Sequence, residues 1–415
     1  MQNIDASVVL SPTDLANHLA CKHVSWLNYR AMLGGPRPSK EEDELSEILR
    51  QYGTEHEAAY FEALKTHLQT LNRNIVNLDS DRDQSAPYTV AALEERAKLT
   101  ADKLADGPDA VYQPTFFSQE NGIGWVGRAD FLVATDTPSD LGNYSFEPED
   151  TKLARIAKVN AVLQLCSYAE HLTNMQGVEP EFIHVVTGSA KEGKVSIRLS
   201  EVSAYFRHVK EVLQNEVLNQ FAGHSEPVPV ENCTMCRWNK DCTRWWREHD
   251  HLSFVAGLQN GHREALNAHG IFTLKEFATS ADSLTVPDIE EEALHRLRRQ
   301  AQLQYATRVN RELNAEALPE TEFLLPLKDF RGFNLLPTPN PGDLFYDIEG
   351  HPYRTDEGLE YLHGFSWQEA DGSFQYKEIW AHTADQERQA LIEVLDFINE
   401  RRAMPGFEDM RVYHF

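Results

Sequence analysis

One aspartate interrupts a strongly apolar run, and its placement constrains the fold more than any other feature of the sequence. The run extends from Trp125 to Ala134 and reads as a strand with Asp130 inside it. A second extended segment, residues 144–152, ends in Glu149-Asp150-Thr151-Lys152. Because an unpaired carboxylate is costly to bury, Asp130 is not readily explained as an ordinary strand residue. Two carboxylates placed close together repel each other and so bind Mg²⁺ or Mn²⁺ well.

A helical pattern follows the second segment and carries Gln164 and Tyr168, four residues apart. An acid on one strand, an acid-x-lysine triplet on the next and a glutamine on the following helix is typical of phosphodiesterases. A metal held by Asp130 and Asp150 would act as a Lewis acid on a phosphate and lower the pKa of a bound water. Lys152 would place positive charge beside the negative charge that develops in the transition state. The D-x-K triplet alone carries little weight, because strands often end in acids and lysines at solvent.

These residues resemble the PD-(D/E)xK nuclease superfamily, and within it the RecB-like branch. Asp130 matches the first acid, Asp150-Thr151-Lys152 matches the (D/E)xK triplet, and Gln164 with Tyr168 matches the Q-x-x-x-Y helix motif. The resemblance implies a mixed α/β, restriction-endonuclease-like core and a metal-dependent deoxyribonuclease. It implies single-stranded or frayed DNA as the substrate, and products with 5′-phosphate and 3′-hydroxyl ends. Gln164 would hold the lysine or the substrate backbone, and Tyr168 would pack nearby or touch phosphate.

A helix expected over residues 45–70 carries Gly53-Thr54-Glu55-His56-Glu57. RecB-like nucleases have a G-x-x-H-E element near this place, and its histidine can join the metal site. The resemblance therefore makes His56 a third candidate ligand. The alternative is that His56 is an exposed helical histidine, although Gly53 is an unusual residue for a helix interior.

The remaining patterns up to residue 250 give the order helix, three strands, helix and strand, which is the core order of that superfamily. Asn121-Gly122 is a hairpin turn signal between the two strands that flank it. We expect helices at 89–106 and 201–221, and strands at 110–117, 125–134, 144–152, 181–187 and 195–199.

Four cysteines frame this region. Ser11 and Pro12 are expected to begin a helix that carries His18, Cys21 and His23. Three more cysteines follow the region at the spacing C-x₂-C-x₅-C, and they are Cys233, Cys236 and Cys242.

The cysteine spacing has two competing interpretations. In the iron–sulfur members of the RecB-like nucleases, one cysteine before the core and three after it hold a [4Fe–4S] cluster, and this sequence matches that layout. Such a cluster would close a very long loop and join the two ends of a domain at residues 1–250. Zinc also binds C-x₂-C pairs, so a zinc site is the alternative. The fifth cysteine, Cys166, is expected in the core.

The spacing of apolar residues and glycines in residues 251–325 predicts a helical linker. The sequences Val255-Ala256-Gly257-Leu258 and His269-Gly270-Ile271 resemble a helix-hairpin-helix repeat, whose backbone N–H groups face a DNA phosphate without reading sequence. A plain helical linker is the alternative. A long charged helix is expected at 288–316, and the Pro-, Gly- and Asn-rich residues 326–341 indicate a boundary.

The segment 340–415 is expected to begin another domain. The apolar run Leu344–Gly350 carries Asp347 and Glu349 and resembles the first motif of DEDD exonucleases and the RNase H-like fold. Two acids at alternate positions of a strand can share a metal. The sequence stops where the next acids of such a site would lie, so we expect this second site to be incomplete, in a fragment of a longer protein that continues into a helicase. The alternative for the two acids is an ordinary strand.

The charge balance is strongly acidic, with 39 Lys and Arg against 65 Asp and Glu and a net charge of −26. A nuclease needs positive charge only along the groove that binds phosphates. No apolar run approaches the length of a membrane span and no secretory signal is present, so we expect a cytoplasmic protein without a membrane partner. A DNA-binding scaffold with a degenerate nuclease site is the rival function. Basic residues cluster at Arg237, Lys240, Arg244 and Arg247, and again at Arg296, Arg298 and Arg299.

Overall fold

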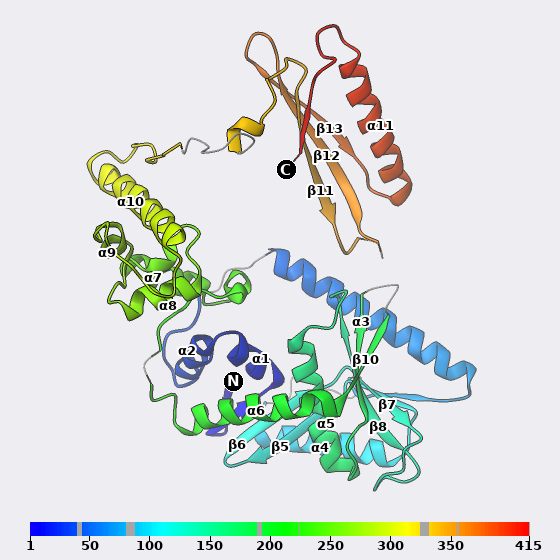
Figure 1. Ribbon diagram of the computed structural model, residues 1–415. Coiled ribbons are helices and arrows are strands. Elements are labelled where there is room, and N and C mark those ends of the chain that lie inside the picture. The colour runs from blue at the N-terminus through cyan, green and yellow to red at the C-terminus, as the bar shows by residue number, and fades with distance from the viewer. Residues whose placement is uncertain are drawn as a thin grey trace.

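The computed structural model describes residues 1–39, 44–79, 88–188, 193–223, 225–323, 332–354 and 357–414. Within these ranges the chain is mixed α/β, and its strands form three sheets (Figure 1). The N-terminal sheet has the order β1 (Gln2–Ile4), β2 (Ser7–Leu10), β6 (Ile123–Arg128), β5 (Thr115–Glu120). The central sheet has the order β10 (Lys194–Arg198), β9 (Phe182–Thr187), β8 (Ser145–Lys152), β7 (Phe131–Thr135), β4 (Ala110–Tyr112), β3 (Ile75–Asn77).

Helices cover both faces of the N-terminal sheet. One face packs on α4 (Val90–Ala105), whose Leu93 joins a cluster with Ile4 and Val9. The other face presents Phe116 and Trp125 to a larger cluster. Because side chains alternate along a strand, one short sheet can serve two packing layers. The helices that supply the larger cluster are α1 (Pro12–Ala20), α5 (Val159–Gln176) and α6 (Leu199–Leu218).

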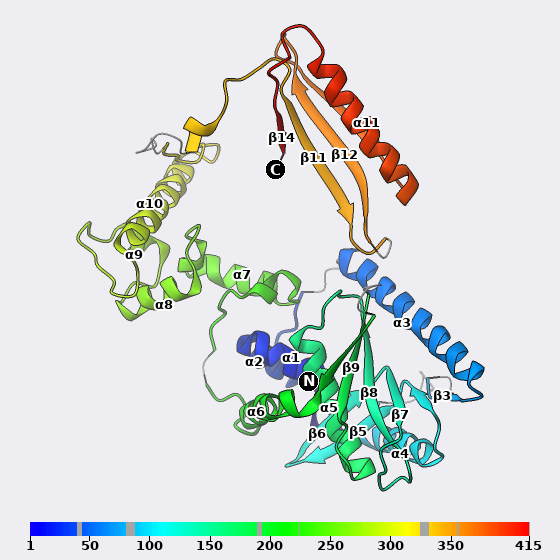
Figure 2. The same ribbon diagram turned by 45° about the vertical axis from the view of Figure 1, so that its right-hand side comes forward.

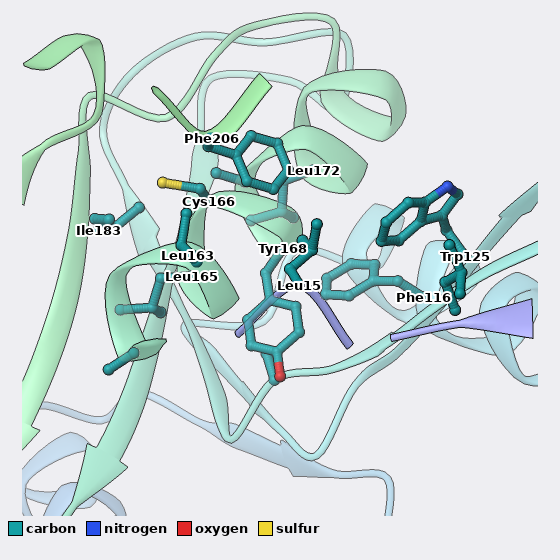
Figure 3. Packing of buried hydrophobic residues seen from close by; sticks show 14 of the residues in the cluster. Leu15, Phe116, Trp125, Leu163, Leu165, Cys166, Tyr168, Leu172, Ile183 and Phe206 are labelled. Carbon is teal, nitrogen blue, oxygen red and sulfur yellow. The ribbon is translucent and has the colours of Figure 1, made fainter. Parts of the chain in front are cut away.

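The central sheet is covered in the same way. On one face, α3 (Glu44–Thr70) packs through Tyr60, whose ring lies 5.2 Å from that of Phe131. On the other face, Leu132 and Phe146 join the cluster around α5 (Figure 3). The helix α5 therefore lies against both sheets and holds them together.

Two of the predicted strands are in fact broken, and the breaks create the site described below. The run 110–117 divides at Gln113 into β4 and β5, and the run 125–134 divides at Asp130 into β6 and β7. Each run passes from one sheet to the other, and Gln113 N donates to Asp130 O at 2.8 Å where they cross. Asp130 is therefore a half-buried junction residue and does not lie inside a strand.

The first predicted helix is also broken. Ser11 caps α1 and Pro12 is its first residue, as expected, but the helix ends at Ala20. Cys21 has extended backbone angles and precedes a second helix, α2 (Lys22–Met32). Cys21 thus lies at a corner between two helices, and it lines one cavity with the three later cysteines.

Residues 231–313 are helical. Their core includes Leu252, Leu266, Phe277 and Leu297. In the basic cluster on the long helix, Arg298 is 6% exposed and pairs with Asp282, while Arg299 pairs with Glu322 at the surface. The elements are η1 (Glu231–Met235), α7 (Asn239–Glu248), η2 (Leu252–Phe254), α8 (Asn260–Ala268), α9 (Leu274–Ala278) and α10 (Glu291–Leu313).

The C-terminal sheet has one covered and one open face. The helix α11 (Ala384–Arg402) packs on the covered face, where Phe365 and Val394 are buried. The predicted boundary at 326–341 falls partly outside the described residues, and η3 (Gly332–Leu335) follows that gap. The sheet has the order β13 (Phe374–Trp380), β12 (Leu359–Gln368), β11 (Leu344–His351), β14 (Val412–His414).

The tip of the β11–β12 hairpin lies beside the first turns of α3 (Figure 2). The rings of Tyr52 and His351 lie 5.5 Å apart, and Arg155 Nη2 donates to Pro352 O at 2.8 Å. None of the helices in the described ranges combines the length and the apolar character that crossing a membrane requires.

Candidate active site

Asp130 and Asp150 lie together where the two sheets meet. Asp130 Oδ2 accepts hydrogen bonds from the backbone N and the Oγ1 of Thr151, at 2.7 and 2.8 Å. The neighbouring Asp150 is fully buried; its Oδ1 has no hydrogen-bond partner among the residues that the structure describes, and its Oδ2 is ion-paired with Lys152. Burial raises the pKa of Asp150 to about 8, and the charge of Asp130 adds to the rise. We call Asp130 and Asp150 the carboxylate pair.

Lys152 supplies positive charge to this pair. It is two residues beyond Asp150 on β8, so both side chains project from the same face of the strand. Lys152 Nζ forms an ion pair with Asp150 Oδ2, while about a third of the lysine side chain (33%) stays exposed. The lysine lowers the pKa of Asp150, but burial and Asp130 together outweigh it. It is therefore electrostatically unfavourable for both carboxyl groups of the pair to be ionised.

The helix α5 adds Gln164 and Tyr168. Gln164 Nε2 donates to the Tyr168 hydroxyl at 2.7 Å. Burial raises the pKa of Tyr168 well above its ordinary value, and the charges of Asp150 and Asp130 act in the same direction. The tyrosine ring belongs to the apolar cluster, whereas its hydroxyl points away from Phe116 (Figure 3).

A glycine makes this placement of the tyrosine possible. A Cβ at Gly127 would lie 3.0 Å from two ring carbons of Tyr168, so a larger residue would displace the ring. In the sequence Gly127-Arg128-Ala129-Asp130, the glycine thus leaves room for the ring of Tyr168, and the aspartate supplies one member of the carboxylate pair.

The helix α3 carries His56 and Glu57, and it brings Glu57 within electrostatic reach of Asp130. His56 Nε2 is buried and has no hydrogen-bond partner among the described residues. Glu57 Oε1 accepts from Tyr112 Oη at 2.8 Å and from Gln113 Nε2 at 2.5 Å. Burial raises the pKa of Glu57, and the charge of Asp130 raises it further. Glu57 was not among the predicted site residues, although it is the final residue of the G-x-x-H-E element that indicated His56.

Glu149 was also missed, and it has a different role. It is fully buried on the strand face opposite Asp150, where it accepts a hydrogen bond from Tyr60 of α3 and pairs with Lys194 of β10. The same face carries Glu147, which bonds His184 at 2.8 Å. The bond from Tyr60 attaches α3 to the sheet, while the contacts with Lys194 and His184 join β8 to its neighbours within the sheet. Because side chains alternate between the two faces of a strand, the sequence alone would have placed Glu149 and Asp150 on opposite faces.

The four predicted cluster ligands Cys21, Cys233, Cys236 and Cys242 line one cavity of about 200 Å³. We call it the cysteine cavity. Asn28 closes one side, because its Oδ1 accepts from Arg237 and from Trp238 Nε1 at 2.7 and 2.8 Å.

The thiols of the cysteine cavity lie within electrostatic reach of one another. Burial raises the pKa of Cys242 to about 12, and Cys236, Cys21 and Cys233 raise it further. All five cysteines in the described ranges are free thiols, and Cys166 is buried in the core as expected.

The predicted second acid pair has a different environment. Asp347 and Glu349 are both exposed on β11. Asp347 Oδ1 accepts from the adjacent backbone N of Ile348 at 3.0 Å, a local contact that brings no second acid to it.

Across the ranges that the structure describes, no group of three or more His, Cys, Asp or Glu side chains is arranged to hold a single metal ion. The carboxylate pair therefore offers two protein ligands. His56, the predicted third ligand, does not form a group of three with them, and Glu57 lies within electrostatic reach of Asp130. No protein-family model matches the sequence, and no curated protein matches it significantly.

Proposed function

We propose that the region 1–250 is a Mg²⁺- or Mn²⁺-dependent deoxyribonuclease with a restriction-endonuclease-like core. The observation that carries the proposal is the buried Asp150 carboxylate, which lies within electrostatic reach of Asp130 and whose Oδ1 has no hydrogen-bond partner among the described residues, while its Oδ2 is ion-paired with Lys152. Leaving a buried carboxylate unsatisfied costs free energy unless a ligand offsets it. A divalent cation is the ligand that suits two adjacent carboxylates.

The residues fit such an ion. Mg²⁺ is commonly bound by one or two carboxylates, with waters and substrate phosphates completing its octahedral shell. Asp130 and Asp150 would supply the two carboxylates, and His56 is a candidate for a further ligand. When bound, the ion supplies Lewis-acid polarisation of the phosphate and a more acidic water.

The protein residues around the ion would position the substrate. The exposed part of Lys152 allows its ammonium group to contact a phosphate oxygen and to stabilise the charge that develops there. Gln164 donates to the hydroxyl of the buried Tyr168, and the two residues would pack beside the site and support it. Glu57 lies close enough to Asp130 to accept a proton from water.

The substrate class rests on the resemblance to RecB-like nucleases, which favours single-stranded or frayed DNA in repair and recombination. The C-terminal sheet would be part of an RNase H-like unit, and a helicase in a longer chain would be the partner. Local positive charge for the phosphates would come from Lys152 and from α7, where Arg244 and Arg247 are exposed.

The test is hydrolysis of a labelled single-stranded oligonucleotide with Mn²⁺ by the wild type, Asp150→Ala and Lys152→Ala. We expect each variant to lose at least about 100-fold in rate, because each removes transition-state charge stabilisation. Variants that digest DNA as fast as the wild type would overturn the proposal. DNA binding by the wild type without cleavage would favour the rival function, a scaffold.

We also propose that the cysteine cavity holds a [4Fe–4S] cluster. The four thiols and the cavity that they line support this assignment. Anaerobically purified protein should be brown with broad visible absorbance, and Cys236→Ser should lose the colour. If the protein is colourless and contains one equivalent of zinc, the cysteine cavity holds zinc and the iron–sulfur assignment is wrong.

A further inference from the structure

One buried asparagine joins the two parts of the chain that supply the cysteine cavity. Asn28 lies on α2, about two helical turns after Cys21, and both residues line the cavity. Asn28 is 6% exposed, and its Oδ1 accepts hydrogen bonds from Arg237 Nη2 at 2.7 Å and from Trp238 Nε1 at 2.8 Å. These two donors directly follow the cysteine at position 236. The asparagine therefore ties the helix that begins at Cys21 to the segment that carries the later cysteines.

Trp238 is also bonded to two of the later cysteines. Its backbone N–H donates to Cys236 Sγ at 3.5 Å. Its backbone O accepts from Cys242 N at 3.0 Å, at the start of α7. The whole residue is buried, and its indole N–H is the one that reaches Asn28. A single tryptophan thus contacts two cysteines through its backbone and the helix of Cys21 through its side chain.

Two further hydrogen bonds hold Cys233. Val230 N donates to Cys233 Sγ at 3.3 Å, and Asn239 Nδ2 donates to Cys233 O at 2.8 Å. Both bonds fix the later cysteines relative to one another, but neither involves the helix of Cys21. Asn28 is the residue that extends this network across to that helix.

We propose that Asn28 and Trp238 are positioning residues, which hold the thiol of Cys21 against the three later thiols so that all four converge on one metal ion or cluster. The inference rests on the proposed ligand role of the cysteine cavity, and it is the same for an iron–sulfur cluster and for zinc. Loss of the Asn28 acceptor would leave two donors without a partner, one of them on the buried Trp238. Residues that orient metal ligands change the affinity for the metal although they do not touch it.

Titration of the whole chain with Co²⁺ tests this role without an activity assay. The protein is first purified free of metal under anaerobic, reducing conditions. Co²⁺ bound by thiolates has intense visible bands whose position depends on the number of sulfur ligands, whereas Co²⁺ bound by carboxylates and water absorbs weakly. We expect Asn28→Leu to raise the Kd for Co²⁺ by about 10-fold to 100-fold and to shift the bands toward those of a three-thiolate site. Asn28→Asp keeps acceptor oxygens for both donors and should stay within about threefold of the wild type.

Gln176→Met is the matched control for the loss of a buried amide. Gln176 is fully buried on α5, and its side chain bonds the backbone N and O of Phe146 at 2.8 and 3.2 Å, away from the cysteine cavity. This variant should lower Tm and leave both the Kd for Co²⁺ and the spectrum unchanged. If it weakens Co²⁺ binding as much as Asn28→Leu does, the effect is one of general stability and the positioning role is refuted.

Trp238→Phe is the milder variant, and it alone decides if Asn28→Leu does not fold. It removes one N–H and keeps a ring, so we expect the Kd for Co²⁺ to rise about threefold to tenfold. Folded variants that bind Co²⁺ as tightly as the wild type, with the same spectrum, would overturn the proposal. A wild type whose Co²⁺ complex lacks thiolate bands would overturn it together with the metal site. If the purified protein is colourless but the Co²⁺ results are as expected, the positioning role stands and the iron–sulfur assignment fails.

Discussion

The chain presents a pair of strand-borne acids twice, in two different environments. Asp130 and Asp150 lie at the meeting of two sheets, under α5, with Asp150 fully buried. Asp347 and Glu349 lie on the open face of the C-terminal sheet and are exposed. Exposed carboxylates are screened by water and need no ligand. Buried neighbouring ones need a proton or a cation, so the first pair, and not the second, is the one for which we propose a metal ion.

The largest expected difference between the two pairs is in activity. We expect Asp130→Asn to lower the rate of DNA cleavage by at least about 100-fold, because it removes one of the two metal carboxylates. Asp347→Asn should stay within about twofold of the wild type, since its side chain is exposed and remote from Asp130. An equal loss of cleavage rate in the two variants would contradict the proposed difference between the two acid pairs.

The next difference is in stability without metal. At pH 8.5 and in EDTA, Asp150→Asn should raise the free energy of unfolding by about 1–3 kcal/mol, because it removes a buried charge whose cost exceeds its pairing with Lys152. Asp347→Asn should leave Tm unchanged. Chemical denaturation of both variants measures the contrast, and destabilisation by Asp150→Asn would contradict the electrostatic account of the pair.

The same buried charge predicts a pH dependence of the stability. The pKa of Asp150 is raised in the folded state to about 8, so its contribution is fully present below its ordinary pKa and is lost as pH rises toward 8. Between those values the metal-free wild type should lose up to about 1.4 kcal/mol per pH unit relative to Asp150→Asn. Added Mn²⁺ should reverse the loss. Parallel stability curves for the two proteins would exclude this titration.

The smallest contrast concerns two tyrosine hydroxyls. Tyr168→Phe removes the acceptor of Gln164 and should cost about 1 kcal/mol together with a loss of activity of about threefold to tenfold. Tyr346→Phe removes the 2.7 Å bond to the buried His363 and should cost about 1–3 kcal/mol with activity unchanged. Paired measurements of kcat and Tm separate the two roles, and an activity loss in Tyr346→Phe would tie the C-terminal sheet to catalysis.

Local patterns in the sequence predicted most elements, because apolar periodicity and caps are local properties. The strand that ends at Lys152, the helix that carries Gln164 and the Ser11-Pro12 helix start all follow from such patterns. The breaks at Gln113 and Asp130 did not, because an apolar run looks the same whether it stays in one sheet or crosses between two. Glu57 was missed because its importance depends on a contact with Gln113, 56 residues away.

The crossing of the two runs at Gln113 and Asp130 has a consequence for how the protein would lose function. If the proposed nuclease site is correct, the alignment of its carboxylates depends on the docking of one sheet against the other, and not on the integrity of either sheet alone. A fluctuation that separates the sheets would then abolish the proposed activity while most of the secondary structure persists. The backbone N–H of Gln113 donates to Asp130 O across this seam. Its exchange with solvent deuterium should therefore accelerate at the same denaturant concentration at which activity is lost.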